Sequence, residues 1–165
     1  MKKHWKNLFS LLLFFLVTIS LHAQSNAFKL LLELNYDSSF PLIYPSQEED
    51  LRSAVFLDTR EIKEYQVSHI PGAIWVGFSD FDTKRLAGIS KDQVVVVYCS
   101  IGVRSETIGK KLKILGFEKV FNLYGGIFHW VNEGKTVEAN GKPTTKVHAY
   151  SRVWGVWLNQ GEKIY

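Results

Sequence analysis

A run of five consecutive apolar, β-favouring residues, Val94–Tyr98, constrains the fold of this chain more than any other segment. Such a continuous run is typical of a strand covered on both faces, as in parallel sheets. Shorter strand-like segments alternate with helical patterns along the chain. We expect strands over 40–44, 54–57, 73–76, 94–98 and 119–123, and helices over 27–34, 46–52, 59–67, 79–86, 104–115 and 127–132. This alternation predicts an α/β fold with a parallel, helix-covered sheet.

The boundaries of several elements carry their own signals. Pro41 and Pro45 restrict the strand over 40–44 to a sheet edge, because proline cannot donate a ladder hydrogen bond. Ser46 is expected to cap the helix that follows it. Gly116 stands where a helix commonly ends in a left-handed residue.

The helix before Gly116 has the clearest amphipathic pattern. Glu106 and Lys110 lie four positions apart, where opposite charges pair on a helix surface. The expected apolar stripe consists of Ile108, Leu112 and Leu115.

The N-terminus reads as an export signal. Lys2, Lys3 and Lys6 precede an apolar run over 8–21, and Ala23 offers a cleavage site, so we expect residues 1–23 to be a signal peptide. The alternative is a membrane anchor, although the run is shorter than the roughly 20 residues of a spanning helix. Export to the periplasm is the expectation, with secretion as an alternative and no stable membrane insertion after processing.

Removal of that segment changes the charge of the chain. The net charge of +4 falls to +1 because three lysines and no acidic residue are lost, so no basic surface suggests nucleic-acid binding. We expect residues 24–165 to form a single domain. Its tail over 134–165 is rich in aromatic residues, which are expected to cover the core or a sheet edge, or alternatively to bind a partner.

The single cysteine, Cys99, directly follows the strongest strand, and a short loop then leads into the clearest helix. Ligands bind beyond the carboxyl ends of strands in open α/β sheets. Loop amides and a helix N-terminus stabilise an anion there, which for cysteine is the thiolate. Gly102 can adopt a positive φ in such a loop, and Arg104 adds a positive charge. The alternative is a buried, inert cysteine.

Several motifs around this loop occur in a recognisable order. They are Leu57–Glu61, Glu64–Tyr65, His69–Ala73, Cys99–Ser105, Leu115–Phe117 and Tyr124–Ile127 with Trp130. The ordered set, covering about residues 54–132, resembles the rhodanese-like sulfurtransferases. One departure is Ser68, which stands where that family usually has glycine before the motif histidine.

The resemblance implies an open parallel sheet of about five strands with helices on both faces. It implies that Cys99 is a nucleophile that takes sulfur from a small anionic donor such as thiosulfate, or from a persulfide, and passes it to a thiol, cyanide or a protein acceptor. No metal or cofactor is expected. The loop residues expected to bind the donor are Ser100, Ile101, Gly102, Val103 and Arg104.

The remaining candidates are supporting residues, with alternatives left open. Arg104 either orients an anionic donor or fixes the loop. Asp58 either caps the following turn or contributes electrostatically, Arg60 either binds the donor or forms a surface ion pair, and Ser105 completes the motif. His69 is expected to make a structural hydrogen bond.

Two other functions remain as alternatives. Four residues separate Cys99 from Arg104, whereas cysteine-dependent phosphatases use five, which argues against phosphatase chemistry. A non-enzymatic module that binds a partner or stores sulfur is the second alternative.

Overall fold

The computed structural model describes residues 26–165, so the expected signal peptide lies outside the described residues and stays a prediction. Residues 26–35 are helical, as expected, and Phe28 and Leu32 are buried side chains of that helix. Residues 35–165 form one compact unit. Across 26–165, no helix combines the length and apolar character needed to cross a membrane.

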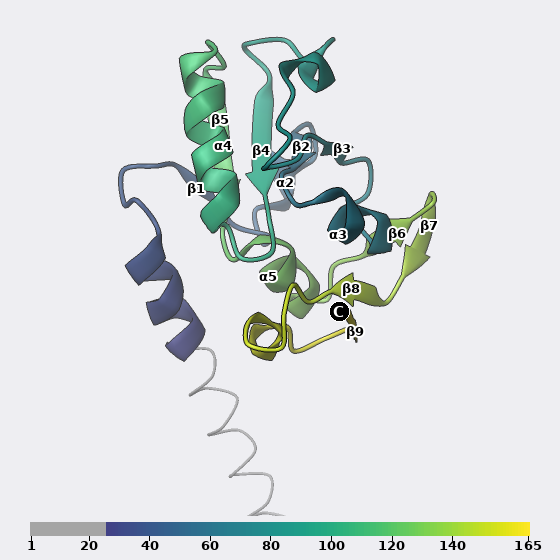
Figure 1. The fold of residues 1–165 in the computed structure, drawn as a ribbon. Helices are drawn as coiled ribbons and strands as arrows, with labels where there is room; N and C mark the ends of the chain where they lie inside the picture. The colour runs from purple at the N-terminus through teal and green to yellow at the C-terminus, as the bar shows by residue number, and fades with distance from the viewer. Residues whose placement is uncertain (1–25) are drawn as a thin grey trace, which may run out of the picture. The chain divides into compact units, whose positions relative to one another are not determined.

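A parallel sheet forms the centre of the compact unit (Figure 1). Among the described residues it has five strands, in the order β1-β5-β4-β2-β3, and every neighbouring pair is parallel. The strands are β1 (Leu42–Ile43), β2 (Val55–Asp58), β3 (Ile74–Trp75), β4 (Val94–Tyr98) and β5 (Lys119–Leu123). The apolar run is β4 and lies between β5 and β2, so the predicted parallel sheet is confirmed, with β1 at an edge as its prolines require.

Helices cover both faces of this sheet. Val95 and Val97 pack with Ile108 of α4 (Val103–Ile114) in the main core cluster. Alternate residues of a strand point to opposite faces. On the other face the ring of Phe56 packs edge-on against Tyr98 and against Trp130 of α5 (Gly126–Asn132). The expected arrangement is therefore confirmed.

Three of the expected helices are shorter than predicted: α2 (Glu48–Leu51), α3 (Ile62–Val67) and the 3₁₀ turn η1 (Thr83–Leu86). A second 3₁₀ turn, η2 (Trp154–Trp157), lies in the tail and was not predicted. Ser46 is not the cap of α2: Gln47 occupies that position, and its side chain accepts a hydrogen bond from the Tyr44 amide instead. α3 begins only after a capping box between Glu61 and Glu64.

α4 confirms two predictions and corrects a third. Gly116 has φ +89°, as the left-handed position requires, and Glu106 pairs with Lys110 at 2.8 Å. Leu115 does not join the buried stripe; it is 42% exposed, because the Phe117 amide bonds back to the Leu112 carbonyl and Phe117 is buried in the core instead.

The C-terminal tail forms two small sheets. Strands β6 (Val137–Ala139) and β7 (Lys142–Thr144) are antiparallel, whereas β8 (Lys146–His148) and β9 (Glu162–Ile164) are parallel. Two backbone hydrogen bonds of 2.9 Å join His69 to Glu138 and attach β6 to the body of the unit. Figure 1 shows the tail, in yellow, on the side toward which the arrowhead of β4 points.

Removing the Leu112 side chain tests the packing of α4. Leu112 is fully buried, so Leu112→Ala is expected to lower the free energy of unfolding by about 2–5 kcal/mol, through lost burial and the cavity that remains. Ile114 lies two positions away and is 86% exposed, so Ile114→Ala is the matched control and is expected to change stability by less than about 0.5 kcal/mol. Urea unfolding measures both, and equal losses would contradict this packing.

Candidate active site

Cys99 begins the loop at the carboxyl end of β4, between the last residue of that strand and α4. Its side chain is buried, and its Sγ accepts a hydrogen bond from the Gly102 amide at 3.1 Å. Gly102 has φ +99°, as predicted, and a Cβ at that position would overlap the Tyr36 hydroxyl. The loop therefore folds back on the sulfur, and only glycine permits this close approach.

A cavity of about 180 Å³ opens beside the sulfur. It is lined by Asn35, Cys99, Ser100, Ile101, Val103, Arg104, Tyr150 and Trp154. Four of the five loop residues predicted to bind the donor line this cavity. The fifth, Gly102, does not line it, but its backbone amide donates to the sulfur. The sequence interpretation missed Tyr150 and Trp154, and its only signal for them was the aromatic content of the tail.

Arg104 is held by a bidentate ion pair with Glu64 of α3. Its Nη1 and Nη2 donate to the two carboxylate oxygens at 2.7 and 2.9 Å, and Nη2 also donates to Ser100 Oγ at 3.0 Å. The Ser100 hydroxyl donates in turn to Glu64 at 3.0 Å. Of the two roles left open for Arg104, these bonds support fixing the loop. Sequence reasoning gave Glu64 no role, although it belongs to a quoted motif.

The charges of this pair shift each other's titration. Burial on its own would raise the pKa of Glu64, but the hydrogen bonds and positive charge of Arg104 lower that pKa below its ordinary value. Burial would likewise lower the pKa of Arg104, but its bonds to Glu64 raise it. Both groups are therefore charged at neutral pH and compensate each other.

The other side of the loop is fixed by Tyr36, another residue to which sequence reasoning gave no role. The Tyr36 hydroxyl donates to the Ile101 carbonyl and accepts from the Gly125 amide at 3.0 Å. Burial raises the pKa of Tyr36 well above its ordinary value, so the hydroxyl keeps the proton that it donates. Tyr36 thus ties the cysteine loop to the turn that begins α5.

Two further contacts hold the loop from β5 and α5. The Asn122 side chain donates from Nδ2 to the Gly102 carbonyl at 2.9 Å, and its Oδ1 accepts from Ser105 Oγ at 2.8 Å, so Ser105 supports the loop indirectly. The Ile127 amide at the start of α5 donates to the Cys99 carbonyl at 2.9 Å. These bonds occupy carbonyls of the loop, whereas the Gly102 amide is directed at the sulfur.

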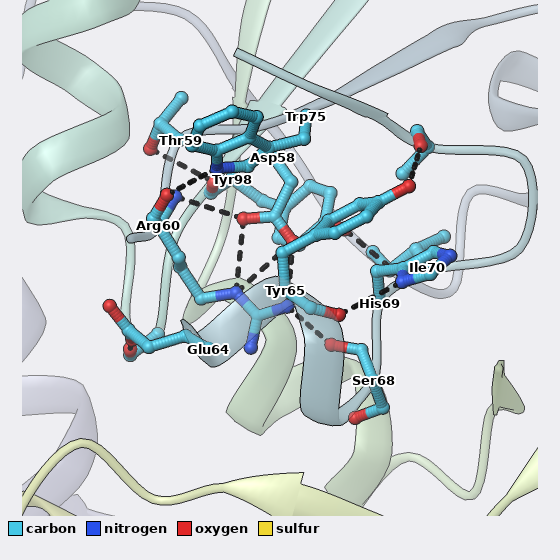
Figure 2. A network of polar contacts seen from close by, with 12 residues as sticks. Asp58, Thr59, Arg60, Glu64, Tyr65, Ser68, His69, Ile70, Trp75 and Tyr98 are labelled. Atoms are coloured by element: carbon cyan, nitrogen blue, oxygen red, sulfur yellow. Dashed lines mark hydrogen bonds and ion pairs between the residues drawn. The ribbon is translucent and has the colours of Figure 1, made fainter. Parts of the chain in front are cut away.

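Asp58 and Arg60 form a buried ion pair (Figure 2). Arg60 Nη2 donates to Asp58 at 2.6 Å and to the Ser68 carbonyl at 2.6 Å, and both side chains of the pair are completely buried. The prediction of a surface ion pair for Arg60 is therefore wrong, because the pair is buried. For the same reason Arg60 is not available to bind a donor. Asp58 also accepts from the Arg60 amide at 2.9 Å, which confirms its turn-capping role.

His69 has the structural role that was expected. Its Nδ1 lies 3.0 Å from the Tyr65 carbonyl, and its ring stacks on the Tyr65 ring with centroids 3.9 Å apart. Figure 2 shows Tyr65 and His69 to the right of the Asp58–Arg60 pair. In the part of the chain that the structure describes, no group of three or more His, Cys, Asp or Glu residues could hold a metal ion.

A five-stranded parallel sheet with a cysteine loop at the carboxyl end of its central strand defines an α/β protein with a candidate thiol site. The model of the rhodanese-like domain family matches residues 46–133, which is over half of the chain. The chain therefore belongs to the rhodanese-like domain family.

Relatives and solved structures agree with this assignment. The chain is 36% identical over 80 residues to "Putative sulfur carrier protein YrkF" of Bacillus subtilis, covering 48% of this chain and 42% of the relative. It is 31% identical over 97 residues to tRNA uridine(34) hydroxylase of Buchnera aphidicola, covering 56% of this chain and 30% of the relative. The match thus spans less than half of the length of these relatives.

Among solved structures, thiosulfate sulfurtransferase from Pseudomonas aeruginosa superposes with a TM-score of 0.53 at 29% identity, covering 62% of this chain and 21% of that one. The BH2092 protein from Bacillus halodurans has a TM-score of 0.53 at 26% identity, covering 66% of this chain and 80% of that one. A rhodanese-like domain from Anabaena, at 22% identity and a TM-score of 0.55, shares the fold and covers 76% of this chain and 89% of that one.

The Glu64–Arg104 pair makes a pH-dependent prediction. Glu64→Gln is expected to lower the free energy of unfolding by about 2 kcal/mol near neutral pH, because charged hydrogen bonds are lost. Since the folded-state pKa of Glu64 lies below its ordinary value of 4.5, this advantage of the wild type is present above that pH and lost as the pH falls through the lower, folded-state pKa. Urea unfolding between about pH 7 and 3.5 measures it. A stability gap that stays constant across this range would contradict the assigned titration.

The buried Asp58–Arg60 pair predicts a larger loss. Asp58→Asn is expected to reduce the free energy of unfolding by about 3–5 kcal/mol, because it leaves the Arg60 charge buried without its partner. Asp80 pairs with Arg85 at 3.3 Å but its side chain is 52% exposed, so Asp80→Asn is the matched control, with an expected loss of at most about 1 kcal/mol. Urea unfolding measures both variants. Similar losses in the free energy of unfolding would show that burial of the ion pair does not determine the size of the loss.

Proposed function

We propose that this chain is a sulfurtransferase in which Cys99 carries sulfane sulfur as a persulfide. The observation that carries the proposal is the 3.1 Å hydrogen bond from the Gly102 amide to Cys99 Sγ, at the wall of a cavity of about 180 Å³. An amide aimed at sulfur stabilises negative charge on it, both in the free thiolate and in the persulfide. Membership of the rhodanese-like family supports the same chemistry.

The reaction has two transfer steps. The Cys99 thiolate attacks the outer sulfur of thiosulfate; the new S–S bond forms as the old one breaks, sulfite leaves with the electron pair, and Cys99 becomes a persulfide anion. An acceptor such as cyanide then attacks the terminal sulfur, leaves as thiocyanate and restores the Cys99 thiolate. Neither step needs an external oxidant, and neither requires a general base at the site once the thiolate is present.

Arg104 acts in this proposal as a positioning residue. Its guanidinium pairs with Glu64 and Ser100, so it holds the loop in the shape that aims the Gly102 amide at the sulfur. The spacing of four residues between Cys99 and Arg104 also disfavours phosphoryl transfer.

A sulfur carrier that hands its sulfur to a protein is the second candidate, because one relative is named a sulfur carrier. Both candidates use the Cys99 persulfide. They differ in turnover: an enzyme passes sulfur repeatedly to a small acceptor, whereas a carrier loads once and waits for its partner.

The persulfide itself is tested by intact mass. Incubating the full chain with thiosulfate, or with a low-molecular-weight persulfide as a second donor, is expected to add one sulfur atom, and cyanide is expected to remove it and release thiocyanate. Cys99→Ser is expected to abolish both steps, since serine cannot form the sulfur–sulfur bond. Steady release of thiocyanate supports the enzyme, and loading without turnover supports the carrier. If neither donor adds sulfur while the thiol of the folded protein is freely alkylated, the proposal fails.

A further inference from the structure

Two aromatic residues of the C-terminal tail line the cavity beside Cys99. Tyr150 and Trp154 lie about fifty residues beyond the loop in sequence, yet they face the same space as Cys99, Ile101 and Val103. The tail therefore adds two rings to a wall that already carries aliphatic side chains.

The backbone holds Tyr150 in place over the site. Its φ of +63° is unusual for a residue other than glycine, and its amide donates to His148 Nδ1 at 3.0 Å. The preceding Ala149 is fully buried, and its amide donates to the Ile164 carbonyl at 2.8 Å. These bonds fix the segment that directs the Tyr150 ring toward Arg104, whose guanidinium lies 4.8 Å from the ring centroid.

The charges around the cavity balance. Arg104 is the only cation among the described residues that line it, and its guanidinium is engaged by the Glu64 carboxylate at 2.7 and 2.9 Å and by the Tyr150 ring. The nearby Arg60 is neutralised by Asp58. An inorganic dianion would thus lose its hydration in a largely apolar cavity without gaining an uncompensated positive charge.

We propose that Tyr150 and Trp154 are specificity-determining residues that favour sulfur donors with an aromatic or other apolar body over inorganic thiosulfate. This inference rests on the proposed function of Cys99. The cavity of about 180 Å³ receives the reacting sulfur, and the organic body of the donor lies against the two rings, where it leaves water and contacts apolar surface.

The chemistry is that of a thiosulfonate or an organic persulfide. The Cys99 thiolate attacks the terminal sulfur of an aryl thiosulfonate, the S–S bond of the donor breaks, and the aryl sulfinate leaves with the electron pair while Cys99 becomes a persulfide anion. With an organic persulfide the leaving group is the thiolate. In both reactions the sulfur atom moves intact and no outside oxidant or reductant is needed.

Two donors of equal charge and different body provide the test. Benzenethiosulfonate and methanethiosulfonate both transfer one sulfur atom, and thiosulfate serves as the inorganic reference. We expect kcat/KM of the full chain for benzenethiosulfonate to exceed that for methanethiosulfonate by about tenfold or more, and that for thiosulfate by a larger factor.

The two donors also differ in the intrinsic reactivity of their leaving groups, but that difference is the same for every variant. A change of the ratio between variants therefore reports the contribution of the two rings. Tyr150→Ala and Trp154→Ala are each expected to reduce the benzene-to-methane ratio by about fivefold or more. Tyr150→Phe, which keeps the ring, is expected to retain the ratio. Val153 lies in the same tail segment, is 76% exposed and does not line the cavity, so Val153→Ala is the matched control and is expected to leave the ratio unchanged.

The outcomes distinguish this inference from the function on which it rests. If the donors load Cys99 but the ratio is near one, or if Tyr150→Ala and Trp154→Ala leave it unchanged, the inference is overturned and the proposed function stands. If the ratio falls equally in Val153→Ala, the tail acts through folding and the inference is again overturned. If no donor adds sulfur to Cys99, both proposals fail.

Discussion

The bidentate ion pair between Glu64 and Arg104 is the contact on which the rest of the site depends. It joins α3 to the first turn of α4, and through Ser100 it reaches into the cysteine loop. Both groups are largely buried, so each needs the other to remain charged inside the protein. The same pairing that shapes the loop also compensates the positive charge of Arg104, and the proposed preference for donors with an apolar body depends on that compensation.

In the cysteine loop, the backbone carbonyls and the Gly102 amide have different partners. Its carbonyls are bound from outside, by Tyr36 at Ile101, by Asn122 at Gly102 and by the start of α5 at Cys99. Its Gly102 amide is thereby left to face the sulfur. Because the loop is restrained at several points, its Gly102 amide does not have to move when negative charge develops on the sulfur. A hydrogen-bond donor that is already in position stabilises such charge most effectively.

The sequence was most informative where a local pattern decides the structure. The strand Val94–Tyr98 has the predicted bounds because apolar, β-favouring residues leave it no stable alternative, and Gly116 ends α4 as expected. Leu115 was misplaced because the chain reverses there and buries Phe117 instead.

The parts of the site that the sequence did not reveal depend on contacts between distant segments. Arg60 looked like a surface charge, and only the carbonyl of Ser68 and the neighbouring carboxylate explain its burial. Nothing near Tyr36 or Tyr150 in the chain indicates that either ring meets the Cys99 loop. The most direct test of the central claim is the amide resonance of Gly102 in ¹H–¹⁵N spectra before and after sulfur is loaded on Cys99. The account predicts that this resonance shifts with its loop neighbours while the amides of β6 and β7 stay in place; an unchanged Gly102 resonance in a fully loaded protein would contradict it.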